Sequence, residues 1–296
     1  MEEKELYLLG RRFKENVKYS PNKEFLIDWV TGKGERRISY NQTAEEIYRL
    51  CWALKGISVK KGDTVAAMSY NTVESAELLI GSALTGYVYG CQNPDLQEDT
   101  LAAIVNDRMA AKVVFFENAY KDKILGMMPK LKSTKHYISL NGASDRDKGI
   151  IGFKDFLSGY EPEEVDVEVE PDEMHCLFMS SGTTGIPKAA IWTHKAFWHG
   201  ACKFAYSQEL GPEDVGCSVG PFFWSSTSMA YLGISIVGRS SNVILDGRMN
   251  IELFCEAVTN EKVNHTVMPA FFLLNLASWP AEELEKYDLS SLKHGL

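Results

Sequence analysis

Short apolar runs and longer amphipathic runs alternate along most of the chain. Runs such as "VVFF" (113–116) and "SNVIL" (241–245) are apolar at nearly every position, which is typical of strands covered on both faces. Between such runs lie stretches with helical spacing, such as "EDTLAAIVNDRMAA" (98–111) and "NIELFCEAVTNEK" (250–262). This alternation predicts an α/β fold in which mostly parallel sheets are covered by helices on both faces.

Four segments have more specific patterns. Two short alternating runs around a glycine-rich turn predict a hairpin over residues 25–40. Thr43 is followed three residues later by a glutamate, a capping-box pattern that predicts a helix over residues 43–56. The apolar run 76–90 is too short to span a bilayer, so it predicts a buried helix. The polar and acidic residues 141–171 predict a long surface connection.

Composition and charge exclude several classes of protein. The chain has 296 residues, of which 45% are hydrophobic and 24% charged, as in globular proteins with ample core material. A formal net charge of -9 argues against nucleic acid as the main partner but leaves room for a local basic pocket. The acidic start "MEEKEL" is unlike a secretory signal, and no apolar run is long enough for a transmembrane segment. We therefore expect a cytoplasmic protein, or a peroxisomal one if a longer C-terminus exists.

The six cysteines are widely scattered, and no Cys-x-x-Cys pair is present. In a chain of this length they are expected to be reduced packing residues and not metal ligands.

The turn "SSGTTGIPK" (180–188) follows an apolar strand pattern directly. Its glycines allow backbone N–H groups to converge on one point, its hydroxyls add donors, and Lys188 adds positive charge. Together these groups predict a polyphosphate-binding loop, although composition alone leaves an ordinary mobile loop as the alternative. The candidate phosphate-binding residues are Ser180, Ser181, Gly182, Thr183, Thr184, Gly185 and Lys188.

Two familiar nucleotide-binding patterns do not fit this turn. A Walker A loop needs Gly-Lys-Ser/Thr, whereas here proline precedes Lys188 and alanine follows it. The Rossmann pattern Gly-x-Gly-x-x-Gly is also absent. These differences disfavour a P-loop phosphotransferase.

The ordered string from Ser180 to Lys188 resembles the signature loop of the adenylate-forming enzymes, which include acyl-CoA synthetases, 4-coumarate–CoA ligases and luciferases. The chain departs from that pattern at Ala189, where the family usually has glycine. The resemblance extends along the whole chain, to "GPFFWSSTSM" (220–229) at the family's aromatic acyl-site motif and to "YDLSSLKHGL" (287–296).

The resemblance implies an incomplete N-terminal AMP-binding domain over residues 1–296, with two stacked, mostly parallel sheets flanked by helices. A first α/β lobe would span residues 51–205 and end in the phosphate loop. Part of a second lobe would span residues 206–296, with residues 1–50 packing on it. Because roughly half of such an enzyme is not represented, the chain is expected to be truncated.

The resemblance also implies an activity and its ligands. The family joins a small-molecule carboxylic acid to AMP from ATP and then transfers the acyl group to a thiol such as CoA. It implies that Lys188 and Thr184 act in catalysis and that Thr184 faces Mg²⁺. Trp224, where many relatives have histidine, and Phe223 would line the acid pocket, although simple core packing is the alternative for both side chains. Fatty, aromatic and luciferin-like acids all remain open.

Two hypotheses follow for the chain itself. One is an acid–thiol ligase represented by the first part of its large domain. The other is a non-catalytic fragment that at most binds nucleotide or a partner.

Overall fold

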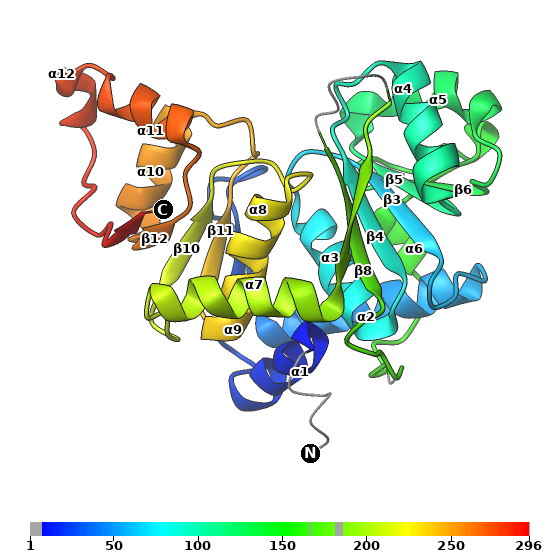
Figure 1. Ribbon diagram of the computed structural model, residues 1–296, viewed down its shortest axis with the longest axis horizontal. Coiled ribbons are helices and arrows are strands. Elements are labelled where there is room, and N and C mark those ends of the chain that lie inside the picture. Colours follow the sequence, from blue (N-terminus) through cyan, green and yellow to red (C-terminus); the bar gives the residue numbers. More distant parts are fainter. Residues whose placement is uncertain (1–7, 166, 181–185, 296) are drawn as a thin grey trace. The chain divides into compact units, whose positions relative to one another are not determined.

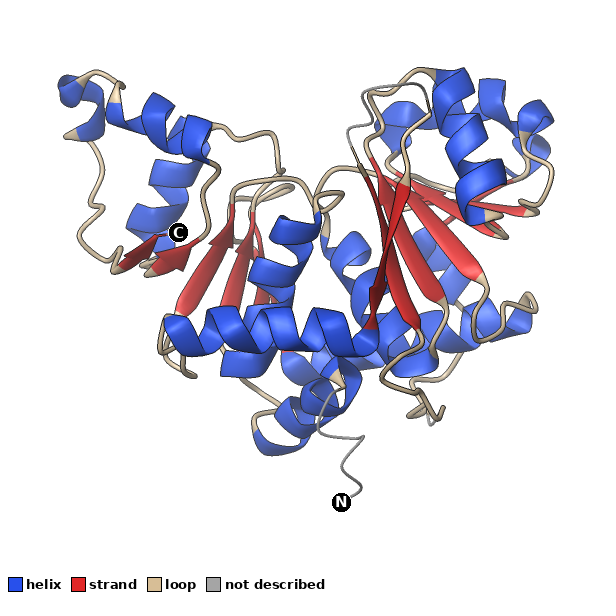
Figure 2. Ribbon diagram, viewed as in Figure 1, coloured by secondary structure: helices blue, strands red, loops and turns tan. Residues whose placement is uncertain are grey.

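The computed structural model describes residues 8–165, 167–180 and 186–295 (Figures 1 and 2). The chain forms two compact units, which are described separately below. The first unit comprises Met1–Arg11, Ala44–Tyr70 and Glu74–Phe197, and the second comprises Arg12–Thr43, Asn71–Val73 and Trp198–Leu296. Among the described helices, the boundaries between the units fall within α1 (Leu9–Tyr19), α2 (Tyr40–Gly56), α7 (His194–Ser207) and, after its first residue, α3 (Val73–Thr85).

The first unit is built on one sheet, to which the described residues contribute seven strands in the order β7-β6-β5-β3-β4-β8-β9. Every neighbouring pair is parallel except β8 and β9, which are antiparallel. The strands are β3 (Thr64–Met68), β4 (Val88–Gln92), β5 (Val113–Phe116), β6 (His136–Ser139), β7 (Ile150–Gly152), β8 (Met174–Met179) and β9 (Ala189–Thr193). The helices are α3 (Val73–Thr85), α4 (Glu98–Ala103) with its π-helical continuation η2 (Ile104–Met109), α5 (Lys121–Met127) and α6 (Phe153–Leu157), with 3₁₀ turns η3 (Asn118–Tyr120), η4 (Met128–Lys130) and η5 (Arg146–Lys148).

Both faces of this sheet are covered at its centre, where β3, β4 and β5 are buried at every position. Val114 and Phe116 of β5 pack into a core shared with α4, η2 and α5. Phe115, which points to the opposite face, makes edge contacts with Phe153 and Phe156 of α6 at centroid distances of 6.3 and 5.9 Å. Helices therefore lie on both sides of the sheet, α4 and α5 on one face and α6 on the other (Figure 1).

The second unit has its own sheet, with six strands among the described residues in the order β13-β12-β10-β11-β1-β2. All neighbours are parallel except β1 and β2, which form an antiparallel hairpin. The strands are β1 (Glu24–Asp28), β2 (Arg36–Ser39), β10 (Val215–Ser218), β11 (Ser241–Ile244), β12 (His265–Thr266) and β13 (His294–Gly295). The helices are α8 (Ser225–Thr227) with the π-helical segment η6 (Ser228–Gly233), α9 (Ile234–Gly238), α10 (Ile251–Glu261), α11 (Ala270–Ala277) and α12 (Ala281–Leu284).

Aromatic pairs contribute to the core of the second unit. Phe254 of α10 and Phe272 of α11 meet edge to face at 5.6 Å within a core that includes Val243 of β11. The ring of Phe25 stacks on that of Tyr40 at 4.3 Å. The two sheets are mostly parallel and flanked by helices, which confirms the predicted α/β fold. The antiparallel pairing of β1 with β2 confirms the predicted hairpin over residues 25–40.

The capping-box prediction, a helix over residues 43–56, placed the start of α2 three residues too late. The helix begins at Tyr40, and Thr43 lies inside it, where its hydroxyl donates to the Ser39 carbonyl. The reciprocal pair is formed by Ser39 and Gln42: the Gln42 N–H donates to Ser39 Oγ at 3.2 Å, and the Ser39 N–H donates to Gln42 Oε1 at 2.9 Å. This is a Ser-x-x-Gln capping box formed by Ser39 and Gln42, in place of the predicted box formed by Thr43 and Glu46.

Two other local predictions were also wrong in part. The run 76–90 is helical only to Thr85, because Gly86 adopts a left-handed φ of 71° and the chain then enters strand β4. The segment 141–171 is not simply a surface connection. It contains β7 and α6, and Phe153, Phe156 and Leu157 of α6 are buried in the first unit, because the apolar residues of "FKDFL" form one face of a short helix.

Candidate functional site

The candidate phosphate loop, residues 180–188, connects the antiparallel strands β8 and β9. The register pairs Met179 with Ala189, so the loop begins and ends at adjacent points of the hairpin. The N–H of Ser180 donates to the carbonyl of Lys188 at 2.9 Å, and the N–H of Lys188 donates to Ser180 Oγ at 3.3 Å. These two bonds fix both ends of the loop against each other. The predicted residues Ser181, Gly182, Thr183, Thr184 and Gly185 lie outside the described residues.

The position of the loop follows from the direction of β8. Strand β8 runs parallel to β4, with Cys176 opposite Tyr89, so Ser180 lies at the carboxyl end of the parallel strands. Open α/β sheets bind ligands at this edge, because the strands end there and the loops that follow are free to diverge. The hydroxyl-rich turn is therefore located where a ligand site is expected.

Two cations flank the described end of the loop. Lys188 is exposed, and Arg108 of η2 donates from Nε to the carbonyl of Pro187 at 3.3 Å. Across the part of the chain that the structure describes, neither side chain has a carboxylate within ion-pair distance. Both charges are available to an anion. Sequence reasoning missed Arg108, because it lies 79 residues from Pro187 and no local pattern links the two.

Two buried histidines, His175 and His194, stack on each other at the end of the β8–β9 hairpin that is opposite the loop. The ring of His175 in β8 stacks on that of His194, the first residue of α7, at 4.6 Å, and Phe197 meets His175 edge-on at 4.8 Å. His175 Nε2 donates to the Leu79 carbonyl at 3.3 Å. Burial, with the charge of Lys61 as a second cause, lowers the pKa of His194 to about 4, and burial lowers that of His175 well below its usual value. Both rings are neutral near pH 7, so they pack without carrying charge.

The second unit contains the other predicted site residues, in the aromatic turn formed by residues 220–224. Phe222 is buried, whereas Phe223 and Trp224 are half-buried and meet edge to face at 6.5 Å. A Cβ added at Gly220 would lie 2.8 Å from Thr227 Oγ1 and 3.2 Å from Trp224 Cε3, so a larger residue would crowd both side chains. The half-buried rings leave apolar surface for a ligand.

Asn71 holds this turn and was not recognised as a site residue from the sequence. Its Nδ2 donates to the Gly220 carbonyl at 2.9 Å, and its Oδ1 accepts from the Phe222 N–H at 2.6 Å. A second tie comes from Ser228, whose hydroxyl donates to the Phe222 carbonyl at 2.6 Å. The asparagine in "SYNTVES" was the available signal, but nothing in the local sequence shows what its amide contacts.

The structure thus brings Ser180 and Lys188 together in the first unit, and Phe223 and Trp224 together in the second.

Among the described residues, no group of three or more histidine, cysteine, aspartate or glutamate side chains is arranged to hold a metal ion. The described cysteines are all free thiols. No helix within the described ranges combines the length and the apolar character needed to cross a membrane.

Comparison with known proteins gives consistent matches. A family model described as AMP-binding enzyme matches residues 13–296. The chain is 25% identical over 285 residues to 4-coumarate–CoA ligase 2 from Petroselinum crispum, a match that covers 94% of this chain and 50% of the relative. The chain spans about half the length of the curated relatives that it matches.

Solved structures share the fold. An anthranilate CoA ligase in complex with anthranoyl-AMP superposes with a TM-score of 0.90 at 19% identity, covering 98% of this chain and 54% of that one. The ATP-bound MatB from Rhodopseudomonas palustris gives a TM-score of 0.79 at 17% identity, covering 97% of this chain and 54% of that one.

Proposed function

Because the chain belongs to the AMP-binding enzyme family, we propose that it takes part in activating a carboxylic acid with ATP as an acyl-adenylate, for transfer to a thiol such as CoA. A carboxylate is a poor acyl donor, since oxide would have to leave. In the proposed reaction a carboxylate oxygen attacks the α-phosphorus of ATP, the bond from that phosphorus to the bridging oxygen breaks, and pyrophosphate leaves. A thiolate then attacks the acyl carbon and AMP leaves.

The closed base of the phosphate loop is the observation that carries this proposal. Transfer at phosphorus depends mainly on positioning and on neutralising charge, and the chain supplies both at one place. The mutual bonds of Ser180 and Lys188 preset the hairpin, while Lys188 and Arg108 present cations without a carboxylate partner among the described residues. This donor set fits a polyphosphate, which takes charge-assisted hydrogen bonds from lysine and arginine.

We assign the binding roles by combining these contacts with the loop sequence. Backbone N–H groups and hydroxyls would hold the β- and γ-phosphates, and Lys188 would lie against them. Mg²⁺, when bound with ATP, would neutralise phosphate charge, and the Thr184 hydroxyl would be one of its protein contacts beside phosphate oxygens and waters. The residues in this proposed phosphate site are Ser180, Ser181, Gly182, Thr183, Thr184, Gly185 and Lys188.

The proposed acid has an apolar body, fatty or aromatic. The half-buried rings of Phe223 and Trp224 offer it apolar surface, held in place by Asn71. The thiol step rests on the family membership and on the ligase relatives.

Acid-dependent exchange of pyrophosphate into ATP tests the proposal directly. We expect exchange with cinnamate or decanoate, and a loss of about 10²–10³-fold in a Lys188→Ala variant, as is typical when a group that stabilises transition-state charge is removed. Lys203→Ala, an exposed lysine on α7, is the matched control and should exchange normally. Exchange that needs no acid, or that survives in Lys188→Ala, would contradict the proposed role.

A second candidate function uses the same loop base, where Lys188 and Arg108 would hold the phosphates of a nucleotide. On this hypothesis the chain binds nucleotide without turning it over. Calorimetric binding of ATP that Lys188→Ala abolishes, together with no exchange for any acid, would favour it over the first.

A further inference from the structure

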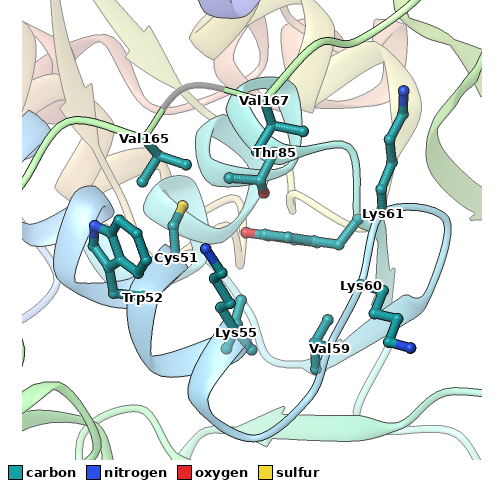
Figure 3. A pocket seen from close by; sticks show the side chains of 11 residues that line it. Cys51, Trp52, Lys55, Val59, Lys60, Lys61, Thr85, Val165 and Val167 are labelled. Carbon is teal, nitrogen blue, oxygen red and sulfur yellow. The ribbon is translucent and has the colours of Figure 1, made fainter.

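A small pocket opens at the other edge of the first unit's sheet, away from the phosphate loop (Figure 3). Its volume is about 260 Å³. The walls come from the last turns of α2, the residues just before β3, the end of α3, and the extended segment that precedes β8. All of these segments belong to the first unit.

The strand directions separate this pocket from the phosphate loop. Lys60 and Lys61 precede β3, and Tyr87 precedes β4, so the pocket lies at the amino ends of the parallel strands. Ser180 and Lys188 lie at the carboxyl ends. A ligand of this pocket would therefore not occupy the proposed activation site.

The lining is mainly apolar, and its hydroxyls are already used. Tyr87 donates its phenolic hydrogen to the Leu78 carbonyl at 2.5 Å, and Thr85 donates to the Gly81 carbonyl at 2.9 Å. Aliphatic side chains make up much of the remaining wall: Leu54, Val59, Val165 and Val167. An apolar body would bury well here, at roughly 25 cal/mol for each Å² removed from water.

Three lysines line the pocket, Lys55, Lys60 and Lys61, and Lys55 is the one that lies against the aromatic wall. Its ammonium is 4.3 Å from the centre of the Trp52 ring, and Trp52 is oriented by the bond from its Nε1 to the Glu163 carbonyl at 2.9 Å. Figure 3 shows the end of Lys55 between Trp52 and Cys51, whereas Lys60 and Lys61 point away from the pocket. Lys61 is paired with Glu173 at 2.8 Å. Lys55 has no carboxylate partner among the residues that the structure describes.

We propose that this pocket is an accessory binding site for a small monoanionic acid with an apolar body. The carboxylate would pair with Lys55, and the body would lie against Val59, Val165 and Val167. Because Lys55 supplies a single positive charge at the apolar wall, a monoanion suits the pocket better than an anion of higher charge.

Fluorescence quenching locates the ligand. The bromine of 8-bromooctanoate should quench the wild-type tryptophan emission, and Trp52→Phe, which keeps an aromatic ring beside Lys55, should remove most of that quenching. Trp279→Phe, in the second unit, should leave the quenching intact, and Trp224→Phe should leave the part that depends on Trp52 intact. Quenching that persists in Trp52→Phe and disappears in Trp224→Phe would place the acid at the aromatic turn and overturn the inference.

Calorimetry with matched ligands tests the charge. We expect octanoate to bind at least tenfold more weakly to Lys55→Glu than to the wild type, 1-octanol to bind both equally, and octylammonium to prefer the variant. Lys154→Glu, an exposed lysine on α6, should bind octanoate as the wild type does. Equal octanoate affinity in Lys55→Glu, or no saturable binding at millimolar octanoate, would refute the proposal. Because Lys188→Ala should leave this binding unchanged while removing pyrophosphate exchange, the two proposals can fail separately.

Discussion

The side-chain amide of Asn71 is bound at both of its ends to the aromatic turn, accepting from the Phe222 N–H at 2.6 Å and donating to the Gly220 carbonyl at 2.9 Å. Asn71 is fully buried. Gly247 packs against it so closely that an added Cβ would lie 2.8 Å from the amide nitrogen, with a φ of 75° that favours glycine. One buried amide therefore fixes the backbone that presents Phe223 and Trp224.

Replacing Asn71 with alanine should destabilise the protein by about 1–3 kcal/mol for each backbone group left buried and unpaired. The free energy of unfolding in urea measures this loss. Asn275→Ala, on the exposed side of α11, is the control and should change stability by less than about 0.5 kcal/mol. Equal effects of the two variants would show that the turn does not depend on the amide.

Arg108 should contribute to nucleotide affinity through the positive charge it brings beside Pro187. An Arg108→Gln variant should bind ATP roughly tenfold more weakly, equivalent to about 1.4 kcal/mol. Calorimetric titration with ATP measures the difference at low and high salt, since the deficit should shrink as salt screens the charge. Arg146→Gln, an exposed arginine of the same unit, should bind as the wild type does.

The stacked histidines should make the protein less stable in acid. Because burial lowers the pKa of His194 from 6.5 to about 4, the unfolded chain takes up a proton on this residue at a higher pH than the folded chain does. The stabilising contribution is complete above pH 6.5 and is lost as the pH falls from 6.5 towards 4, on the order of 3 kcal/mol for this residue.

Urea unfolding at a series of pH values measures this loss. His175, whose pKa burial lowers further, should act in the same direction. A His194→Gln variant should be less stable near pH 7 but should show a shallower decline between pH 6.5 and 4. If the unfolding free energy of that variant falls with pH as steeply as that of the wild type, His194 is excluded as the titrating group.

The start of α2 offers a test of the observed cap against the predicted one. Ser39→Ala removes the side-chain acceptor for the Gln42 N–H and should cost about 1 kcal/mol of unfolding free energy. Gln42→Ala should remove the reciprocal bond to the Ser39 N–H and have a smaller effect. A Glu46→Ala variant, by contrast, should show no loss of a cap. A larger loss from Glu46→Ala than from Ser39→Ala would restore the original prediction.

Local pattern alone could not choose between two capping boxes in "SYNQTAEE". Both Ser39 and Thr43 are followed three residues later by a residue that can complete a box. The choice depends on where strand β2 ends. The last pair between β1 and β2 joins Glu24 to Ser39, so the strand continues to Ser39 and the helix starts after it. A contact between strands, and not the helix sequence, therefore decides where the helix begins.

The sequence by itself determined the α/β class, most of the strands and helices, and the position of the hydroxyl-rich turn after a buried strand. Those features depend on periodicity and on the order of residues within short segments, which the chain displays directly. Tertiary structure decided that Arg108 lies at Pro187, that Asn71 holds the aromatic turn, and that a pocket with Lys55 opens at the amino edge of the sheet. Each of these joins segments separated along the chain by strands and helices, and the distance between such segments is set by how sheets and helices pack, which no local pattern encodes.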